Sequence, residues 1–445
     1  MATTSESQTE RNPPAKTGWI REYRQALRTF SPSMRRYLLA MALVTLTSFG
    51  LVPVLQNLYL LRLGFDVQFI GLLVGLGQVV WAATALPAGM VSNRIGLRKG
   101  VTVGFGLMGL GLALLLLAET WPQPQWRTWL MVSLVVWWLG VAFAVVNIPP
   151  FMMAVTGERE RRYAFAASAA MIPAMAFVGS LVGGLAPGLL AGPLGASLDQ
   201  SAPYRSALGL GPFLIWGACW VMVGADPAHV VRSGSSAKGD GRAPLALLTF
   251  FGLVTFLGAT GEGMVRTFFN VYLDTGLGVT PAAIGTIMGT AQLLPIGAAL
   301  ASPILVARWG TGNALVVGLL GMGIFLVPLA AIPLVWVAGI AYMGIIAMIA
   351  LSSPVRDMFG QEIVSAPWRT TSQSAATIGL ALGWAAAGLA GGMLIKASGF
   401  GALYFTGALA ALLGVGLLVA YLRWPIARPP VLEQSTPVMP EEIAP

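Results

Sequence analysis

The sequence contains very few of the residues on which catalytic and metal chemistry depend. Its 445 residues include a single cysteine, Cys219, and a single histidine, His229. One cysteine excludes an internal disulfide and a cysteine-based metal site, and no nucleophile–base pair stands out as it would in a membrane-embedded enzyme. No segment matches Gly-x-x-x-x-Gly-Lys-Ser/Thr, which excludes ATP as the direct energy source. We therefore expect no enzyme activity, no metal and no cofactor.

Charged residues are also scarce. They make up 10% of the chain, against roughly 25% in a soluble domain, while 56% of the residues are hydrophobic. A transmembrane helix needs about 20 mostly apolar residues, and the sequence contains twelve such stretches. They are 37–62, 68–92, 99–120, 128–155, 162–190, 204–224, 245–274, 281–307, 313–332, 334–358, 370–396 and 400–422. The sequence thus predicts an all-α integral membrane protein with twelve transmembrane helices.

The few charges that are present are distributed unevenly. The net charge is +9, and with a cytoplasmic N-terminus twenty-one of the 26 Lys and Arg residues fall on the cytoplasmic side. The opposite side receives four, namely Arg62, Arg127, Arg205 and Lys396. This bias follows the positive-inside rule. It predicts a multi-pass protein of the plasma (inner) membrane with both termini cytoplasmic, and it argues against a nucleic-acid partner.

The two halves of the chain repeat each other. Segment 89–96, GMVSNRIG, reappears at an offset of 214 as segment 303–310, PILVARWG. Further along, segment 184–188, GLAPG, reappears at an offset of 204 as segment 388–392, GLAGG. Repeats of this kind are typical of secondary transporters, which bind their substrate between the two halves. We predict two pseudo-symmetric bundles of six helices each.

The expected organisation follows from these patterns. Residues 1–36 form a cytoplasmic tail whose segment 19–30 has an apolar and a basic face, as in a helix that lies on a membrane surface. Residues 37–224 form the N-terminal half, 225–243 a cytoplasmic linker, 244–423 the C-terminal half and 424–445 a disordered cytoplasmic tail. Ser31, Asp66 and Thr280 are placed to cap the helices that follow them.

Glu262 and Arg266 are the only charges that we place deep within a predicted span. Charges at this depth are costly and usually functional, and a spacing of four puts both on one helix face. Three interpretations stay open: a structural ion pair, a proton or cation acceptor at Glu262 tuned by Arg266, or an anion-binding Arg266. Because Gly261 and Gly263 flank Glu262, we also expect an irregular helix there.

Several amides lie within predicted spans. The repeat relates Asn57 to Asn270 and Gln78 to Gln292, and Asn147 stands alone in the fourth span. Buried amides either join helices by hydrogen bonds or line a cavity, and the sequence does not separate these roles. We include all five as candidate substrate- or proton-binding residues. Trp81 and Trp384 are further candidates for cavity lining.

The loop between the second and third spans resembles the signature of the major facilitator superfamily (MFS). That family has Gly-x-x-x-Asp-Arg-x-Gly-Arg-Lys/Arg, where this chain has Gly89, Asn93, Arg94, Gly96, Leu97 and Arg98, and the loop after the eighth span keeps Arg308 and Gly310. The resemblance covers about residues 35–425. It implies a conformational gate that locks the cytoplasmic side. Asparagine at position 93 lacks the charge of the family's aspartate, so we expect a weaker lock, or one shared with segments 158–162 and 362–369.

The resemblance implies a monomeric secondary transporter that works by alternating access. The few polar residues in an apolar core favour proton-coupled export of small amphipathic compounds. The proton-antiport motif itself is missing, because the fourth span carries no charge between Leu134 and Met153. The alternative is an uptake symporter or facilitator for a polar solute such as a sugar or organic acid. A receptor that uses the transporter fold without transporting is a third possibility.

Overall fold

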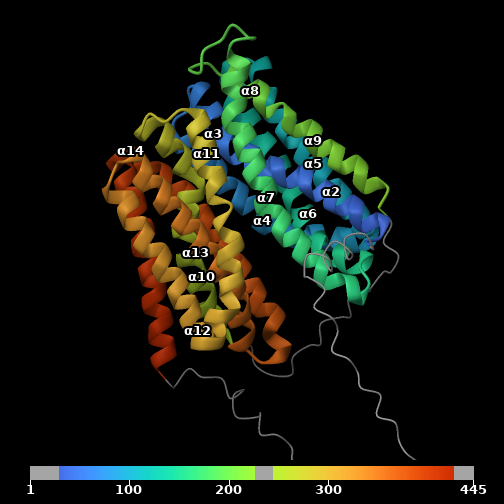
Figure 1. Cartoon of the computed structure of the whole chain (residues 1–445), viewed down its shortest axis with the longest axis vertical. Helices are drawn as coiled ribbons and strands as arrows, with labels where there is room; N and C mark the ends of the chain where they lie inside the picture. Colours follow the sequence, from blue (N-terminus) through green and yellow to red (C-terminus); the bar gives the residue numbers. More distant parts are fainter. Residues whose placement is uncertain (1–29, 226–243, 425–445) are drawn as a thin grey trace, which may run out of the picture.

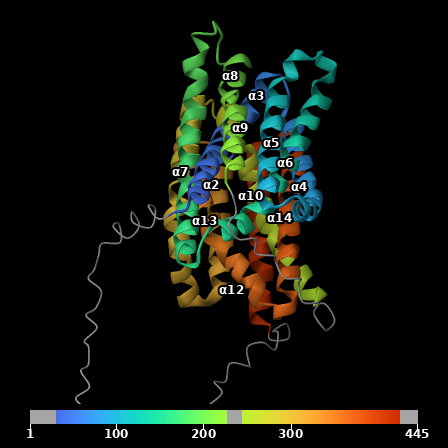
Figure 2. The same cartoon turned by 90° about the vertical axis from the view of Figure 1, so that its right-hand side faces the viewer.

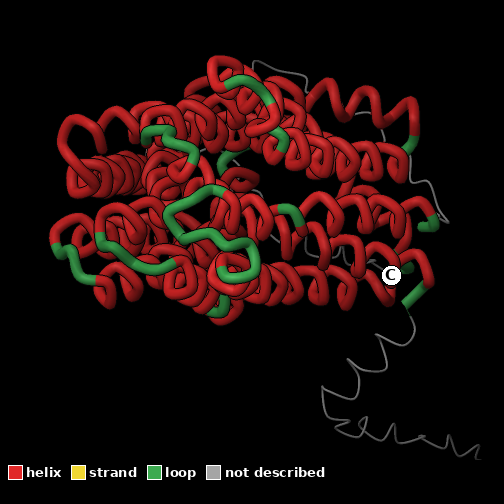
Figure 3. The backbone as a smooth tube through the Cα atoms, turned by 90° about the horizontal axis from the view of Figure 1, so that it is seen from above, coloured by secondary structure: helices red, strands yellow, loops and turns green. Residues whose placement is uncertain are grey.

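The computed structural model describes residues 30–225 and 244–424, and within these ranges the chain is helical (Figure 3). The all-α prediction is confirmed. The amphipathic segment predicted for 19–30 lies outside the described residues apart from Phe30, as do nearly all of the linker 225–243 and of the tail 424–445. The domain boundaries assigned to those segments therefore stay predictions.

The described part of the N-terminal half contains six helical segments long and apolar enough to cross a membrane. In chain order its elements are α2 (Pro32–Thr45), the π-helix η1 (Leu46–Leu51), α3 (Val52–Arg62), α4 (Val67–Ile95), α5 (Leu97–Leu116), the short 3-10 turns η2 (Ala118–Thr120) and η3 (Gln123–Gln125), α6 (Trp126–Val155), α7 (Glu158–Ala191), α8 (Ala202–Leu208) and α9 (Leu210–Val223). The first helix begins at Pro32, directly after the predicted cap residue, and the predicted membrane span from residue 37 starts within it. The Ser31 hydroxyl caps this helix by accepting from the Met34 N–H, as predicted.

The C-terminal half repeats the pattern with longer elements. They are α10 (Leu245–Val271), the π-helix η4 (Tyr272–Gly276), α11 (Pro281–Ala291), α12 (Leu294–Ala331), α13 (Val335–Glu362), the 3-10 turn η5 (Ala366–Trp368) and α14 (Arg369–Arg423). Two of these, α12 and α14, change direction at Gly310 and Gly399. Ten helices of the described chain are long and apolar enough to cross a membrane. The number twelve stays a prediction.

The backbone itself carries the internal repeat. Among the described residues six glycines have a positive φ, and they form three pairs at the offsets seen in the sequence: Gly64 with Gly278, Gly96 with Gly310, and Gly195 with Gly399. Positive φ is the conformation that residues with a side chain rarely adopt. Each pair therefore places a tight turn at an equivalent position of the two halves.

The two halves form an inverted V in Figure 1, and in the side view of Figure 2 the N-terminal helices lie in front of the C-terminal helices. We call the side that holds Phe30, Ala225, Pro244 and Trp424 the terminal face, and the opposite side, which holds Arg62, the far face. Two pairs of helices contact each other across the two halves. They are α4 with α14, and α7 with α11. The halves meet toward the far face and diverge toward the terminal face (Figure 1).

Glycines allow both crossings. A Cβ on Gly71 of α4 would lie 2.3 Å from the Gly388 carbonyl oxygen of α14, and one on Gly285 of α11 would lie 2.6 Å from the Gly184 Cα of α7. The repeat relates Gly71 to Gly285 and Gly184 to Gly388. The two crossings are therefore equivalent under the symmetry, and both require backbones in direct contact.

The expected irregularity around Glu262 is absent, because α10 is a continuous α-helix from Leu245 to Val271. Its glycines serve packing instead. Gly261 lies against the Gly407 backbone, and Gly263 makes room for the side chain of Trp384. The backbone departs from α-helical geometry only beyond this helix, in η4.

Candidate functional site

Asn57 and Asn270 join the halves near the far face. Asn57 Nδ2 donates to the Thr267 carbonyl oxygen at 2.7 Å and to Asn270 Oδ1 at 3.1 Å. In return, Asn270 Nδ2 donates to the carbonyl oxygens of Pro53 and Val54, at 2.9 and 3.3 Å. Both side chains are buried. The repeat that relates the two asparagines thus brings them into direct contact between α3 and α10.

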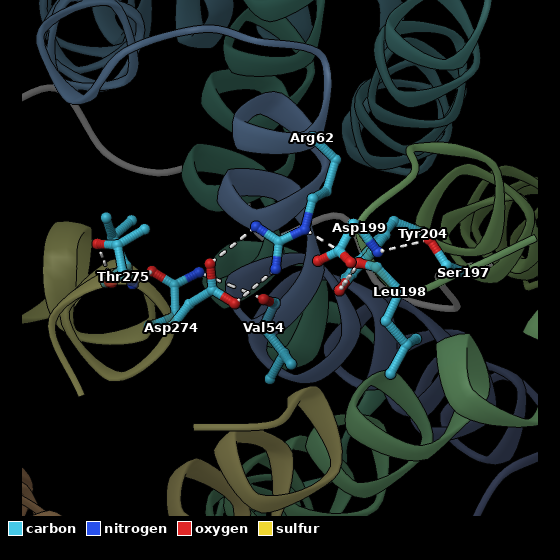
Figure 4. A network of polar contacts seen from close by, with 10 residues as sticks. Val54, Arg62, Ser197, Leu198, Asp199, Tyr204, Asp274 and Thr275 are labelled. Atoms are coloured by element: carbon cyan, nitrogen blue, oxygen red, sulfur yellow. Dashed lines mark hydrogen bonds and ion pairs between the residues drawn. The ribbon is translucent and has the colours of Figure 1, made fainter. Parts of the chain in front are cut away.

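One turn closer to the far face, Arg62 at the end of α3 forms a bidentate ion pair with Asp274 of η4. The two N–H···O distances are 2.9 and 2.8 Å (Figure 4). Arg62 Nε also donates to the Leu198 carbonyl oxygen at 3.0 Å, and the guanidinium lies 5.5 Å from the Tyr204 ring centroid. A fork of this geometry is the strongest type of ion pair available to arginine.

The other three cations predicted for this side also have partners. Lys396 of α14 donates to the Gln68 side chain of α4 at 3.1 Å, which makes another contact between the halves. Arg205 pairs with Glu119 at 3.2 Å within the N-terminal half. Arg127 lies 5.7 Å from the ring centroid of Phe69. In addition to the asparagine pair, two polar contacts therefore join the halves toward the far face, Arg62 with Asp274 and Lys396 with Gln68.

The predicted gate loops lie at the terminal face. Asn93, Arg94 and Arg308 are exposed there, and Gly89 and Arg98 are half-buried. Gly96 and Gly310 provide turns two residues after Arg94 and Arg308. In the same region Glu362 accepts a hydrogen bond from Thr311 of its own half. The residues assigned to the gate thus lie where the halves diverge, and their locking role stays a prediction.

Glu262 and Arg266 form an ion pair on α10, with Nε and Oε1 2.7 Å apart. The Glu262 side chain is 8% exposed, whereas that of Arg266 is 37% exposed. Glu262 also borders a cavity of about 30 Å³ between α10, α12 and α13, to which Thr255, Ser352 and Arg356 contribute polar groups. This volume holds one or two water molecules. The carboxylate therefore has both a fixed cation and a polar space beside it.

Gln78, Trp81 and Trp384 lie at the crossing of α4 and α14, and we call these three residues the aromatic seam. The rings of Trp81 and Trp384 stack across the halves, with centroids 6.2 Å apart and planes 24° apart. Gln78 is 4% exposed. The Oε1 of Gln78 and both indole Nε1 atoms are buried without a hydrogen-bond partner in the described chain. Buried polar atoms without hydrogen-bond partners are uncommon in native proteins, and those that occur often have a functional explanation.

The remaining candidates are dispersed. Asn147 Nδ2 donates to Ser92 Oγ and to the Phe143 carbonyl oxygen, both at 2.7 Å, and so joins α6 to α4 within one half. Gln292, the symmetry mate of Gln78, follows α11 at a break in the helix. The two glutamines are therefore not equivalent in their surroundings. No group of three or more His, Cys, Asp or Glu side chains gathers in the described residues as metal ligands would.

Sequence reasoning did not find the Arg62–Asp274 pair. Arg62 was assigned only to the topological charge bias, and Asp274 received no role. A signal was present, because these residues follow Asn57 and Asn270 by five and four positions in the two repeats. Opposite charges at nearly equivalent ends of two symmetric helices are brought together when the helices meet.

Comparison with known proteins agrees with this architecture. The family model described as Major Facilitator Superfamily matches residues 37–355. No curated protein matches the chain significantly.

Among solved structures, the chain is similar to the nucleoside transporter NupG, with a TM-score of 0.67 at 13% identity, covering 89% of this chain and 100% of that one. It is similar to a bacterial homologue of the human lysosomal transporter Spinster, inward-facing and occupied, with a TM-score of 0.66 at 14% identity, covering 91% and 98%. It is also similar to a D-xylose–proton symporter, with a TM-score of 0.65 at 14% identity, covering 88% and 97%. At these identities the likeness shows a shared fold.

Proposed function

From the premise that this chain belongs to the Major Facilitator Superfamily, and is thus a multi-pass membrane transporter of small molecules, we propose that it exports small amphipathic compounds by alternating access coupled to protons. In this proposal the protein is a monomer of the plasma membrane. The terminal face is cytoplasmic, in agreement with the positive-inside distribution of Lys and Arg. The far face is then external.

The observation that carries the proposal is the closure of one face only. Toward the far face, the asparagine pair and the Arg62–Asp274 pair join the two halves. At the terminal face, Arg94 and Arg308 of the gate loops are exposed. Halves that contact each other toward one face and diverge toward the other (Figure 1) support a cycle in which they rock about a central site. The described conformation corresponds to the inward-facing state of such a cycle.

Glu262 is the residue that we propose for proton coupling. A proton on its carboxylate removes the negative charge that balances Arg266, 2.7 Å away, inside the membrane. The Arg266 side chain is 37% exposed, but a charge without a partner at membrane depth is costly. Protonation therefore changes which conformation the C-terminal half prefers, provided that Arg266 gains solvent or another partner in only one conformation.

The surroundings favour an amphipathic substrate. The aromatic seam provides two indole faces and few polar atoms. Uptake of a polar solute is the alternative, and the likeness in fold to a D-xylose–proton symporter and a nucleoside transporter supports it. A polar solute needs several hydrogen-bonding groups around it, however, because unpaired hydroxyls are costly to bury. The seam offers three unpartnered polar atoms.

The test is transport by purified protein in liposomes with an imposed pH gradient. The panel comprises lipophilic dyes, sugars and organic acids. We expect gradient-driven movement of the dyes, and we expect Glu262→Gln to abolish the dependence on the gradient while dye binding persists. Glu119→Gln makes the same chemical change at an ion-paired carboxylate within the N-terminal half and is expected to leave the dependence intact. Gradient-driven movement of sugars or organic acids alone would overturn the export proposal.

A second variant separates coupling from a purely structural ion pair. Replacing both partners, as Glu262→Gln with Arg266→Gln, leaves no charge of the pair without its partner at membrane depth. If the pair were structural only, this double variant would regain gradient-dependent transport. Proton coupling through Glu262 predicts that the double variant folds and binds dye but does not respond to the gradient.

A further inference from the structure

The aromatic seam has a composition that selects one kind of molecule. Gln78 and Trp81 are three residues apart on α4 and so share a helix face, and Trp81 stacks on Trp384 of α14. On the N-terminal side Trp138 of α6 lies 6.5 Å from Trp81 between ring centroids. On the C-terminal side Trp384 packs against Gly263 of α10. Two helices from each half thus meet at this point.

Two glycines leave room for the indole rings, because neither has a side chain at the point where a ring packs. A Cβ on Gly77 would lie 2.1 Å from Trp138 Nε1, and a Cβ on Gly263 would lie 3.0 Å from Trp384 Cδ1. Any larger residue at either position would displace an indole ring. Each half therefore has a glycine against which an indole ring packs, Trp138 on Gly77 and Trp384 on Gly263.

The unpartnered atoms indicate which groups a ligand at the seam would have to carry. Two indole N–H groups require acceptors, and the Gln78 carbonyl oxygen requires a donor. The nearby charges of α10 already neutralise each other in the Glu262–Arg266 pair. A complementary ligand is therefore uncharged and flat, and it carries an acceptor and a donor on its edge. Indole rings stack most favourably with a planar ligand.

We infer that the aromatic seam binds uncharged planar heteroaromatic compounds that present a ring carbonyl and an N–H on one edge. The carbonyl oxygen accepts from the N–H groups of Trp81 and Trp384, and the ligand N–H donates to Gln78. This inference rests on the proposed transport function and specifies its substrate class. Because the seam includes residues of both halves, a bound ligand contacts both halves when they rock.

The experiment measures direct binding to the purified full-length protein by calorimetry, with four probes. 2-Quinolinone is planar and carries both edge groups. Its N-methyl derivative lacks the donor, naphthalene lacks both groups, and decahydro-2-quinolinone keeps both groups but is not planar. We expect 2-quinolinone to bind best, and each of the others to bind roughly fivefold or more weakly, since each loses a hydrogen bond or the stacking.

Single-residue variants test which side chain makes each proposed contact with the ligand. Gln78→Leu is expected to abolish the difference between 2-quinolinone and its N-methyl derivative. Trp81→Phe and Trp384→Phe keep an aromatic face but remove an N–H, and we expect each to weaken 2-quinolinone while leaving naphthalene nearly unchanged. Trp216→Phe is the control, because its indole donates to the Gly106 carbonyl oxygen away from the seam. Circular dichroism and thermal unfolding verify that every variant is folded.

The outcomes separate the inference from the proposed function. Equal affinities for all four probes, or losses as large with Trp216→Phe as with the seam variants, would overturn the inference. Proton-driven dye transport in liposomes would still stand in that case. Conversely, selective binding of 2-quinolinone without gradient-driven transport of any compound would retain the binding site and reject proton-coupled export.

Discussion

At the scale of single residues, the asparagine pair shows that two residues related by the internal repeat can contact each other directly. Asn57 and Asn270 each donate to backbone carbonyls of the other half, so each stabilises the closed far face. Interhelical hydrogen bonds in membranes contribute about 0.6 kcal/mol on average and up to about 1.7. We expect Asn57→Ala to weaken closure by roughly 1–2 kcal/mol, because it removes two such bonds.

The measurement is labelling of a cysteine introduced at the far face of a Cys219→Ser background, in Asn57→Ala, Asn270→Ala and the double variant. The effects are expected to be less than additive, since the side chains bond to each other. Full additivity would mean that the direct contact between the two asparagines contributes nothing to closure.

The Arg62–Asp274 pair depends on the shape of the guanidinium. Both terminal nitrogens bond the carboxylate while Nε bonds Leu198, and lysine has no fork with which to replace them. We expect Arg62→Lys to increase far-face labelling nearly as much as Arg62→Gln, with a loss of about 1–3 kcal/mol for charged hydrogen bonds. Arg205→Lys is the control, because Arg205 makes a single 3.2 Å contact within one half. Labelling of Arg62→Lys at the parent level would show that charge alone closes this face.

At the scale of helices, closure depends on glycine contacts between the halves. A Cβ on Gly184 of α7 would lie 2.7 Å from the Pro281 carbonyl oxygen and 2.8 Å from the Gly285 Cα of α11. Backbone atoms cannot move aside as a flexible side chain does. We therefore expect Gly184→Val to separate α7 from α11 and to open the far face, as measured by cysteine labelling.

Gly188 provides a matched control one turn along the same helix. A Cβ there would meet nothing within 4 Å, so Gly188→Val changes the same residue type in the same helix without a collision. We expect its labelling to equal that of the parent. If both variants behaved alike, the effect of Gly184→Val would come from helix propensity rather than from the contact between the halves.

At the scale of the whole molecule, alternating access requires the far face to open. Gln68 and Lys396 contact each other across the halves at 3.1 Å, so cysteines at these two positions are suited to a short bifunctional cross-linker. In the Cys219→Ser background we expect cross-linking to abolish transport, and cleavage of the linker to restore it. The control pair is Glu119 and Arg205, whose contact lies within the N-terminal half. Transport that survived a complete Gln68–Lys396 cross-link would contradict the rocking of the halves.

Much of the architecture was predictable, because it depends on patterns that a chain carries locally. Apolar stretches require helices in a membrane, and Ser31 and Asp66 cap helices as expected. The irregular helix at Glu262 was predicted wrongly. Considered alone, Gly261 and Gly263 indicate a flexible helix. In the fold they allow α14 to pack closely against α10. A glycine has the same sequence signature in both roles.

The candidate site was only partly predictable. The sequence identified Glu262 and Arg266 because charge within an apolar run is visible locally, and their ion pair follows from helical spacing. It did not distinguish Gln78 in the seam from Gln292 at a helix break. Repeats make residues equivalent in position along the chain, whereas their partners depend on how two different halves pack together.

The sequence alone determined that this protein is helical and embedded in a membrane, that it is duplicated, and that its turns recur at Gly96 and Gly310. These properties follow from hydrophobicity and local backbone geometry, which need no distant partner. Only the tertiary structure decided that Asn57 meets Asn270, that Arg62 meets Asp274, and that Trp81 stacks on Trp384. Each of these contacts joins residues more than 200 positions apart, and such proximity is set by the packing of the two halves against each other.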